Sequence, residues 1–273
     1  MSTPSPVTRA LTPVGKFFGL FAEIGRQGLR RPFQWRELVE QTWFVTKVSA
    51  LPTALFTIPF GATIALLLGE LTRQFGAQSQ TGAGAVMNSL NPRPGSSIAI
   101  FGCGSVGLAG VLGASVAGCG TIIAVDPNAA RLDLARELGA THAIDPTEDD
   151  PINAIQQIRA SGVHYTLECT GKPEVLRQAV DSLTLTGVCG LIGVSPAGTE
   201  CAIDMNGILF GRSLRGIIEG DSVPDVFIPR LIDLYKQGRF PFDKLVTYYD
   251  FEDINKAVED TEQGRVIKAV LRP

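Results

Sequence analysis

The stretch SIAIFGCGSVG, residues 97–107, decides the fold of most of this chain. Its first five residues form an apolar run typical of a buried strand, and the rest follow the pattern G-x-G-x-x-G before a helical pattern begins. Gly102 permits the tight turn, Gly104 lets a phosphate approach the backbone, and Gly107 lets the helix pack closely on the strand. The stretch therefore predicts a strand–turn–helix unit whose helix N-terminus offers free N–H groups to a phosphate.

The next predicted strand, TIIAV at residues 121–125, ends in Asp126. A carboxylate there accepts hydrogen bonds from ribose hydroxyls and would repel a 2′-phosphate, which favours NAD over NADP. Arg131 would weaken that preference, although NAD-binding domains are also expected to carry a ribose-binding basic residue there. A Rossmann-like sheet with a vestigial site is the alternative. We predict NAD as the cofactor, with these binding residues: Gly102, Gly104, Ser105, Val106, Gly107, Asp126 and Arg131.

Beyond the glycine-rich turn, short apolar runs alternate with helical patterns, which predicts an α/β fold with a doubly wound parallel sheet. A short helix, Gly82–Leu90, and a turn at residues 91–95 precede the first strand. The expected strands are Ile98–Phe101, Thr121–Val125, His142–Ile144, His164–Glu168, Val188–Ile192 and Leu214–Ile218. The expected helices are Val106–Ala117, Asn128–Leu138, Pro151–Ala160, Glu174–Leu183 and Pro224–Gln237.

The N-terminal part differs in character. Residues 1–47 carry seven Lys or Arg against three Glu, a net charge of +4. Val14–Phe33 has the pattern of an amphipathic basic helix, for which a surface helix of a soluble protein is the alternative. Val48–Gly69 has no charged residue, and as a helix it would be about 33 Å long, enough to cross the hydrocarbon core of a bilayer. A buried helical hairpin broken at Pro52 and Pro59 is the other interpretation.

Charge and cysteine usage narrow the class of protein further. The net charge of −3 argues against a nucleic-acid partner. The five cysteines form no C-x-x-C pair, so they predict neither a disulfide framework nor a zinc site, and they suit a reduced, cytosolic domain. Basic residues lie on the N-terminal side of the uncharged run, so that end is expected to face the cytoplasm. We therefore expect membrane contact through residues 14–69, with a cytoplasmic Rossmann domain tethered to the inner face of the plasma membrane.

The N-terminal part also resembles a known family. The segment FVTKVSALPTALFTIPFGATIALLLGELTRQFGAQS, residues 44–79, is similar to the start of the MCE-associated lipid-transport permeases of the MlaE/YrbE type. The resemblance covers roughly residues 10–79, a minority of such a permease. A transport function therefore cannot be carried over to this chain.

The segment TGAGAVMNSLNPRPGSSIAIFGCGSVGLAGVLGASVAGCGTIIAVDPNAARLDLARELGATHAID, residues 81–145, resembles the zinc-dependent medium-chain alcohol dehydrogenases, above all those acting on aryl or benzyl alcohols. The resemblance runs to residue 273. It implies an NAD-dependent oxidation of a primary alcohol to an aldehyde, and it places Val106 behind the nicotinamide ring. It further implies cofactor contacts by these residues: Cys169, Thr170 and Gly171 near the nicotinamide ribose, Ile192, Gly193 and Val194 at the carboxamide, and Lys268 at the pyrophosphate.

The resemblance also implies a catalytic zinc with three protein ligands, which this sequence does not supply. Two of them belong to an N-terminal domain without a counterpart here, and the third would be a Cys where this chain has Ala77. His142 and His164, the only histidines, lie in or beside predicted strands and are interpreted as structural. We therefore predict no catalytic residue and no metal ligand. The chain is expected to bind NAD without activating an alcohol.

The expected organisation is a helical, membrane-associated, permease-like fragment at residues 1–79, with its hydrophobic segment at 48–69, and a dinucleotide-binding domain at residues 80–273. The two resemblances meet at Gln80–Thr81 without a polar spacer, which predicts a gene fusion, a recombination product or an assembly error. A membrane-tethered NAD-binding module is the alternative function. A homodimer through the sheet edge near Leu214–Ile218 is implied by the dehydrogenase resemblance.

Overall fold

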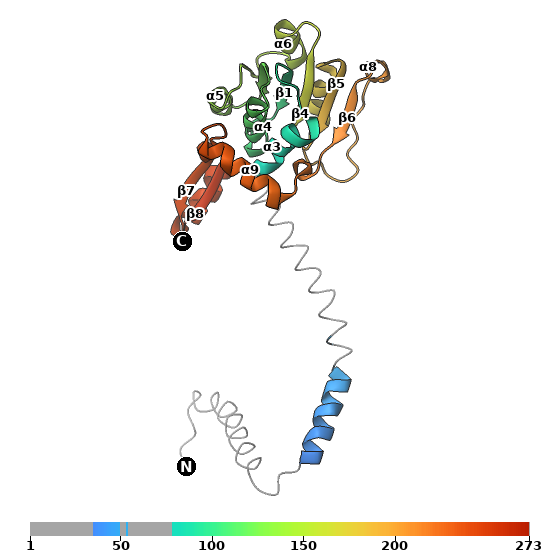
Figure 1. Ribbon diagram of the computed structural model, residues 1–273, viewed down its shortest axis with the longest axis vertical. Coiled ribbons are helices and arrows are strands. Elements are labelled where there is room, and N and C mark those ends of the chain that lie inside the picture. Colours follow the sequence, from blue (N-terminus) through green and yellow to red (C-terminus); the bar gives the residue numbers. More distant parts are fainter. Residues whose placement is uncertain (1–34, 50–52, 54–77, 273) are drawn as a thin grey trace, which may run out of the picture. The chain divides into compact units, whose positions relative to one another are not determined.

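The computed structural model describes residues 35–49, 53 and 78–272 (Figure 1). The chain divides into two compact units, Met1–Leu68 and Gly69–Pro273. In the first unit, residues 35–49 form a helix whose residues are all exposed. The predicted helix at Val14–Phe33 and nearly all of the uncharged run at 48–69 lie outside the described residues. Within the described ranges, no helix is both long enough and apolar enough to cross a membrane.

The second unit is built on a six-stranded parallel sheet with the order β3-β2-β1-β4-β5-β6, which confirms the predicted doubly wound α/β fold. The chain reverses direction across the sheet between β1 and β4, so the loops that follow these two strands diverge and leave a crevice at their carboxyl ends. The strands are β1 (Ser97–Phe101), β2 (Thr121–Val125), β3 (His142–Ile144), β4 (Val163–Glu168), β5 (Leu183–Leu191) and β6 (Ser213–Gly216).

Helices cover both faces of this sheet (Figure 1). The α-helices of this unit are α3 (Gln78–Gly84), α4 (Ser105–Val116), α5 (Ala129–Glu137), α6 (Pro151–Ile158), α7 (Pro173–Asp181), α8 (Met205–Leu209), α9 (Pro224–Lys236) and α10 (Ile254–Glu262). Shorter helical turns are the π-helical η1 (Ala85–Leu90) and the 3₁₀ turns η2 (Glu219–Asp221), η3 (Phe242–Leu245) and η4 (Phe251–Asp253).

Two apolar cores lie on opposite faces of the sheet, and β1 contributes to both by alternation. Ile98 and Ile100 belong to the core under α4 and α5, whereas Ala99 and Phe101 belong to the core under α6 and α7. All five residues of β1 are buried, as expected of a central parallel strand. The fingerprint turn after β1 is therefore held on a fully buried, rigid support.

Helix α4 is apolar on every side because it is covered on every side. Glycines let its neighbours approach: a Cβ added at Gly82 of α3 would lie 1.8 Å from the carbonyl oxygen of Val106, and one at Gly113 would lie 3.1 Å from Cα of Ala83. The close packing of α3 on α4 fixes the start of α4, which is the helix N-terminus that the fingerprint turn feeds.

Several elements differ from the predicted ones. The expected single helix Gly82–Leu90 is an α-helix followed by the π-helical turn η1, which ends at Asn91 in a left-handed conformation. β5 begins at Leu183, earlier than expected, and β6 ends at Gly216 rather than at Ile218. Sequence patterns did not indicate α8 or α10, because both are short and lack a long apolar stripe.

The C-terminal region forms a separate two-stranded parallel sheet of β7 (Val246–Asp250) and β8 (Lys268–Arg272), connected by η4 and α10. Between α10 and β8 the chain turns at Gly264, which has φ of +68°, and β8 starts at Lys268. Asp260 of α10 joins these pieces, since it accepts hydrogen bonds from the Tyr249 hydroxyl at 2.7 Å and from Arg265 Nε at 2.6 Å.

Candidate functional site

The turn after β1 has the backbone geometry that a phosphate-binding loop requires. Gly102 has φ of +92°, and its N–H donates to the carbonyl of Val125 on β2 at 2.8 Å. A Cβ added at Gly107 would lie 1.8 Å from the carbonyl oxygen of Gly102, so only glycine allows this contact between helix and turn. A Cβ added at Gly104 would meet no atom within 4 Å, which leaves open space beside the N-terminus of α4.

Asp126, directly after β2, lies beside this turn and is 4% exposed. Its Oδ2 accepts a hydrogen bond from the Cys103 N–H at 2.7 Å, and its Oδ1 accepts one from the Asn128 N–H at 2.9 Å. Each carboxylate oxygen can accept a further hydrogen bond, so the group still has capacity for hydroxyls of a ligand. The carboxylate thus ties the turn to β2 and offers acceptors at the end of the strand.

Arg131 supplies the counter-charge to Asp126. Its Nη1 lies 4.0 Å from Asp126 Oδ2, and its side chain is 30% exposed. Its Nε is buried and has no hydrogen-bond partner within the part of the chain that the structure describes. Its Nη2 faces Gly264, where an added Cβ would lie 3.3 Å away, so the turn before β8 forms part of its surroundings. Arg131 therefore brings a partly exposed positive charge to the end of β2, beside the Asp126 carboxylate.

These groups line a cleft of about 370 Å³ at the carboxyl ends of β1, β2 and β4. The sequence had predicted all but two of its lining residues. Pro127 and Lys172 were missed, although they directly follow Asp126 and Gly171, which were predicted to bind the cofactor. The lining residues are Gly102, Gly104, Ser105, Val106, Gly107, Asp126, Pro127, Arg131, Cys169, Thr170 and Lys172.

The loop after β4 is shaped by Glu168, which is fully buried. Its Oε1 accepts hydrogen bonds from the Thr170 N–H at 2.7 Å and the Gly171 N–H at 3.1 Å, and also from the Thr170 hydroxyl. The Cys169 N–H donates to the carbonyl of Phe101 at the end of β1, at 2.9 Å. The Glu168 carboxylate therefore folds its own loop so that Cys169 and Thr170 form one wall of the cleft.

A second cleft, of about 300 Å³, lies on the other side of this loop and shares Lys172 with the first. It contains Gly171 and Gly193, two of the residues that the dehydrogenase resemblance assigned to the cofactor. Gly193 is held tightly, because a Cβ added there would lie 2.5 Å from Glu168 Oε2. Ile192 is half-buried and Val194 is 89% exposed. Neither of them, nor Lys268, lines either cleft.

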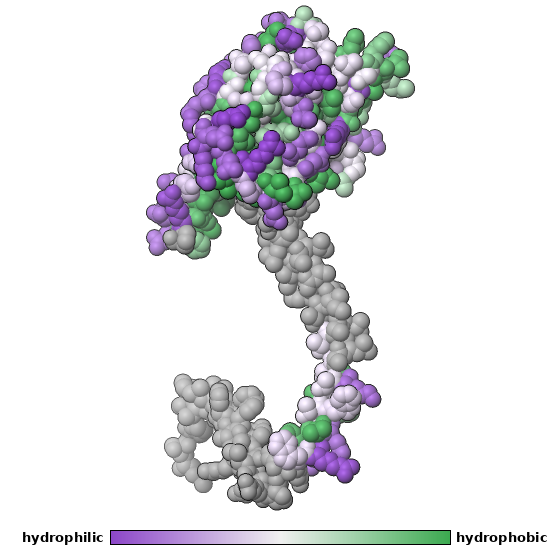
Figure 2. Space-filling view, viewed as in Figure 1, coloured by the Kyte–Doolittle hydropathy of each residue, from purple (hydrophilic) through white to green (hydrophobic). Residues whose placement is uncertain are grey.

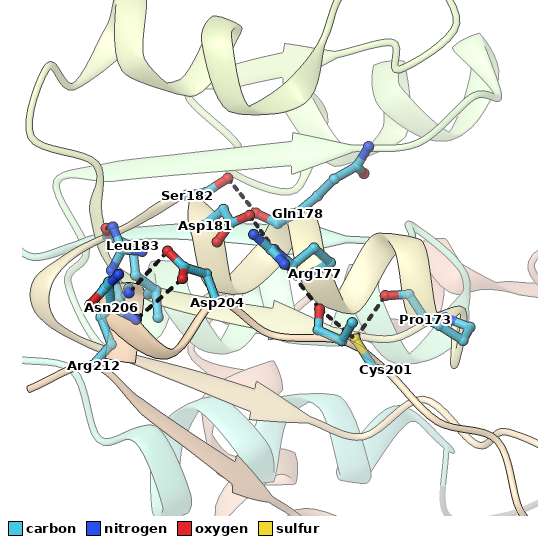
Figure 3. Close-up of polar contacts among 12 residues, drawn as sticks. Pro173, Arg177, Gln178, Asp181, Ser182, Leu183, Cys201, Asp204, Asn206 and Arg212 are labelled. Atoms are coloured by element: carbon cyan, nitrogen blue, oxygen red, sulfur yellow. Dashed lines mark hydrogen bonds and ion pairs between the residues drawn. The ribbon is translucent and has the colours of Figure 1, made fainter. Parts of the chain in front are cut away.

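The outer wall of the second cleft is fastened to α7 (Figure 3). The Cys201 thiol donates to the carbonyl of Pro173 at 3.2 Å, and Arg177 Nη1 donates to the carbonyl of Ala202 at 3.1 Å. Arg177 also pairs with Asp181 one turn along the helix. These contacts hold the segment that follows Val194 against the N-terminal half of α7.

Cys103 and Cys169, two thiols near the clefts, are poor nucleophiles and poor metal ligands. Burial, with the nearby Asp126 carboxylate, raises the pKa of Cys103 to about 12. Burial also raises the pKa of Cys169 well above the ordinary thiol value, with Glu168 adding to the effect. Metal binding requires the thiolate, which such environments disfavour.

The donors of the described residues do not fit a three-ligand zinc site, because they bring no group of three His, Cys, Asp or Glu side chains together. His164 is instead engaged with β1, since its Nδ1 lies 3.1 Å from the Ser97 N–H nitrogen and 2.7 Å from the Ser97 hydroxyl. His142 contacts the neighbouring Thr141 hydroxyl at 2.9 Å. Ala77, at the position of the implied third ligand, lies outside the described residues.

Comparisons with known proteins agree with this geometry. Residues 105–237 match the family model described as "Zinc-binding dehydrogenase". The chain is 44% identical to a geraniol dehydrogenase of Castellaniella defragrans, over 74% of this chain and 55% of that protein. It is 37% identical to a class-2 alcohol dehydrogenase isozyme of Oryctolagus cuniculus, over 72% of this chain and 52% of that protein. The chain thus spans about half the length of the curated relatives it matches.

Solved structures give the same result. The benzyl alcohol dehydrogenase of Acinetobacter calcoaceticus aligns with a TM-score of 0.70 and 45% identity, over 71% of this chain and 54% of that one. An alcohol dehydrogenase zinc-binding domain protein from Burkholderia ambifaria aligns with a TM-score of 0.70 and 52% identity, over 71% of this chain and 53% of that one.

Proposed function

We propose that the C-terminal unit, which corresponds to the Rossmann domain of the zinc-dependent alcohol dehydrogenase family, binds NAD(H) in the cleft at the ends of β1, β2 and β4. The observation that carries the proposal is the Asp126 carboxylate, nearly buried, beside a glycine turn with open space at Gly104. The turn and the N-terminus of α4 would hold the pyrophosphate, and Asp126 would accept hydrogen bonds from the adenosine ribose. Bound NAD supplies a hydride acceptor.

Discrimination between NAD and NADP follows from the same carboxylate. A 2′-phosphate would lie against a negative charge whose oxygens already accept backbone N–H groups, and Arg131, 4.0 Å away, neutralises that charge only in part. We therefore expect NAD to bind more tightly than NADP.

Isothermal titration of the full chain with each cofactor tests this proposal. Replacing Asp126 by Asn keeps the shape and one acceptor oxygen but removes the charge. NAD affinity should fall about tenfold, because a hydrogen bond to a charged group is weakened, while the preference over NADP narrows. Asp145, which follows β3 and whose carboxylate is engaged by Thr147, serves as the matched control: Asp145→Asn should bind both cofactors as the parent does. Equal NAD binding by Asp126→Asn and the parent would contradict the proposal.

The alcohol chemistry of the relatives is a separate proposal. The similarity to about half the length of known alcohol dehydrogenases supports an oxidoreductase ancestry. The His, Cys, Asp and Glu side chains of the described residues, however, do not fit the zinc site that would activate an alcohol. We propose that this chain on its own binds NAD(H) without measurable oxidation of benzyl alcohol or geraniol. The test is NADH formation by absorbance, with zinc analysis of the same sample. Turnover together with stoichiometric zinc would overturn this proposal.

The N-terminal unit supports a second proposal, that residues 14–69 contact a membrane and hold the Rossmann domain at its cytoplasmic face. The helix at residues 35–49 favours it, because seven large apolar side chains of that helix are exposed. Co-sedimentation of the full chain with vesicles should bring the protein into the pellet, and protein that stays in the supernatant at low salt would refute it.

We make two further proposals, one about a homodimer and one about the origin of the chain. The edge strand β6, exposed along its whole length, would pair with a second copy to form a homodimer, which sedimentation analysis can test. The chain would also be a fusion of a permease-like fragment, residues 1–79, with the dehydrogenase domain, residues 80–273. A single transcript that reads through residues 80–81 would exclude an assembly error and leave a natural fusion.

A further inference from the structure

The helix at residues 35–49 has two different sides. At about 100° per residue, five of its seven large apolar side chains and both of its threonines lie on one arc of about 160°. This arc consists of Trp35, Leu38, Val39, Thr42, Trp43, Val45 and Thr46. The Thr42 hydroxyl donates to the carbonyl of Leu38 at 2.7 Å, so its hydrogen is used within the helix. In Figure 2 the hydrophilic residues of this helix gather along one side of it.

The charged side chains lie outside this arc. Arg36 and Lys47 fall beside Trp43 at one border of the arc, and Glu37 falls on the far side of the helix. Glu40 pairs with Arg36 at 3.0 Å. Phe44 and Val48 are the apolar residues that lie among the charged ones. Basic residues at the border can extend toward lipid headgroups while their methylene stems cover apolar surface.

The tryptophans point to the kind of surface that this face meets. Trp35 and Trp43 are 67% and 69% exposed, and indole rings are enriched at membrane interfaces, where one part of the ring is apolar and the N–H stays hydrated. The sequence before the helix, residues 1–34, carries five Lys or Arg against one Glu, and the sequence after it, residues 50–69, is uncharged. This charge pattern complements an anionic bilayer rather than a second copy of the same basic segment.

We propose that the helix at residues 35–49 lies in the plane of an anionic lipid surface, with the Trp35–Trp43 arc immersed in the headgroup and acyl boundary. This inference deepens the proposal of membrane contact, because it names the element, its orientation and the lipid charge. The helix binds along its side and does not cross the bilayer. Arg36 and Lys47 contact lipid phosphates from the border of the arc.

The chain offers an internal probe of this face. Trp35 and Trp43 are the only two tryptophans in the sequence, so fluorescence excited at the red edge of the tryptophan band reports on this helix alone. The full chain is titrated with vesicles of phosphatidylcholine and with vesicles that also contain phosphatidylglycerol. We expect the emission to move to shorter wavelength with the anionic vesicles, and lipids with brominated acyl chains to quench it.

Two variants that add the same charge on different sides of the helix distinguish the effect of the apolar face from the effect of net charge. Val39→Glu places a carboxylate within the arc, between Trp35 and Trp43, and should weaken binding to anionic vesicles at least about tenfold, through loss of apolar burial. Gln41→Glu places the same charge on the opposite side of the helix and should bind nearly as the parent does. Arg36→Gln should weaken binding about fivefold, the effect of one basic residue near an anionic surface.

The results distinguish this inference from the broader proposal. Co-sedimentation with vesicles but unchanged tryptophan emission would overturn the role of this helix and leave membrane contact to other residues. If the protein neither co-sediments with vesicles nor changes its tryptophan emission, both this inference and the proposal of membrane contact are wrong. A tryptophan emission that shifts with protein concentration in the absence of vesicles would mean that the apolar arc binds a second copy of the chain. Equal loss of vesicle binding in Val39→Glu and Gln41→Glu would show that the arc is not the lipid-binding face.

Discussion

Asp126 and Glu168 are buried acidic residues at the ends of β2 and β4, the strands on either side of β1, and their surroundings differ. Asp126, after β2, accepts one backbone N–H on each oxygen and borders the cleft of the glycine turn. Glu168, at the end of β4, accepts donors from Thr170 and Gly171 of its own loop; it does not line that cleft but borders the second one. An acid at a strand end is therefore not by itself a binding residue. Such an acid can bind a ligand only if its carboxylate oxygens can still accept hydrogen bonds from the ligand and are not used up by donors of the protein itself.

The largest expected effect comes from replacing Glu168, whose carboxylate is hydrogen-bonded within its own loop. Glu168→Leu would leave the Thr170 and Gly171 N–H groups buried without an acceptor, so the free energy of unfolding should fall by about 3 kcal/mol or more. Urea denaturation followed by circular dichroism measures this loss. Glu174→Leu, at an exposed position of α7, should change stability by less than about 0.5 kcal/mol. Similar stability of the two variants would mean that Glu168 does not hold the loop.

A pair of glycine variants sharpens the distinction between structural and ligand-facing positions. Gly104→Ala meets no protein atom within 4 Å, so stability should change by no more than about 1 kcal/mol. NAD affinity should nevertheless fall about 10- to 100-fold, since the methyl group displaces the phosphate from the backbone N–H groups. Calorimetric titration at a temperature where the variant is fully folded gives the affinity.

Gly107→Ala should behave in the opposite way. Its methyl group would collide with the carbonyl of Gly102, so stability should fall by about 1–3 kcal/mol together with NAD binding. If Gly104→Ala bound NAD as the parent does, the phosphate would not occupy the space beside that residue.

The smallest expected effect concerns a third carboxylate, Asp260, which lines neither cleft. Hydrogen bonds from Tyr249 and Arg265 lower the pKa of Asp260 below its ordinary value of 3.8. Because the folded-state pKa is the lower one, this contribution to stability is present above pH 3.8 and is lost as the pH falls through the folded-state pKa. The unfolding midpoint in urea, measured from pH 6 down to pH 3, should fall less steeply for Asp260→Asn than for the parent. An identical slope would show that Asp260 does not contribute.

Local patterns account for much of the fold. Apolar runs of a few residues, separated by helical stretches, predicted all six strands of the main sheet. For β1 and β2 the reason is that strands buried on both faces are apolar throughout. This reason does not extend to β6, which is an exposed edge strand. The same patterns failed for α10, β7 and β8. In β7 the sequence VTYYD mixes aromatic and polar residues, and the strand is partly exposed, so burial imposes little pattern on it.

The sequence by itself determined the glycine turn, Asp126 at the end of β2, and the order of strands and helices around them. These features depend on the conformational freedom of glycine and on burial of contiguous residues, which are local properties. Only the tertiary structure decided that Glu168 turns into its own loop, that Lys172 borders the cleft, and that Gly264 lies against Arg131. The Gly264–Arg131 contact joins segments far apart in the chain, so no local spacing encodes it. The donors to Glu168 are local, but its burial depends on the packing of the loop after β5, where Gly193 lies against its carboxylate.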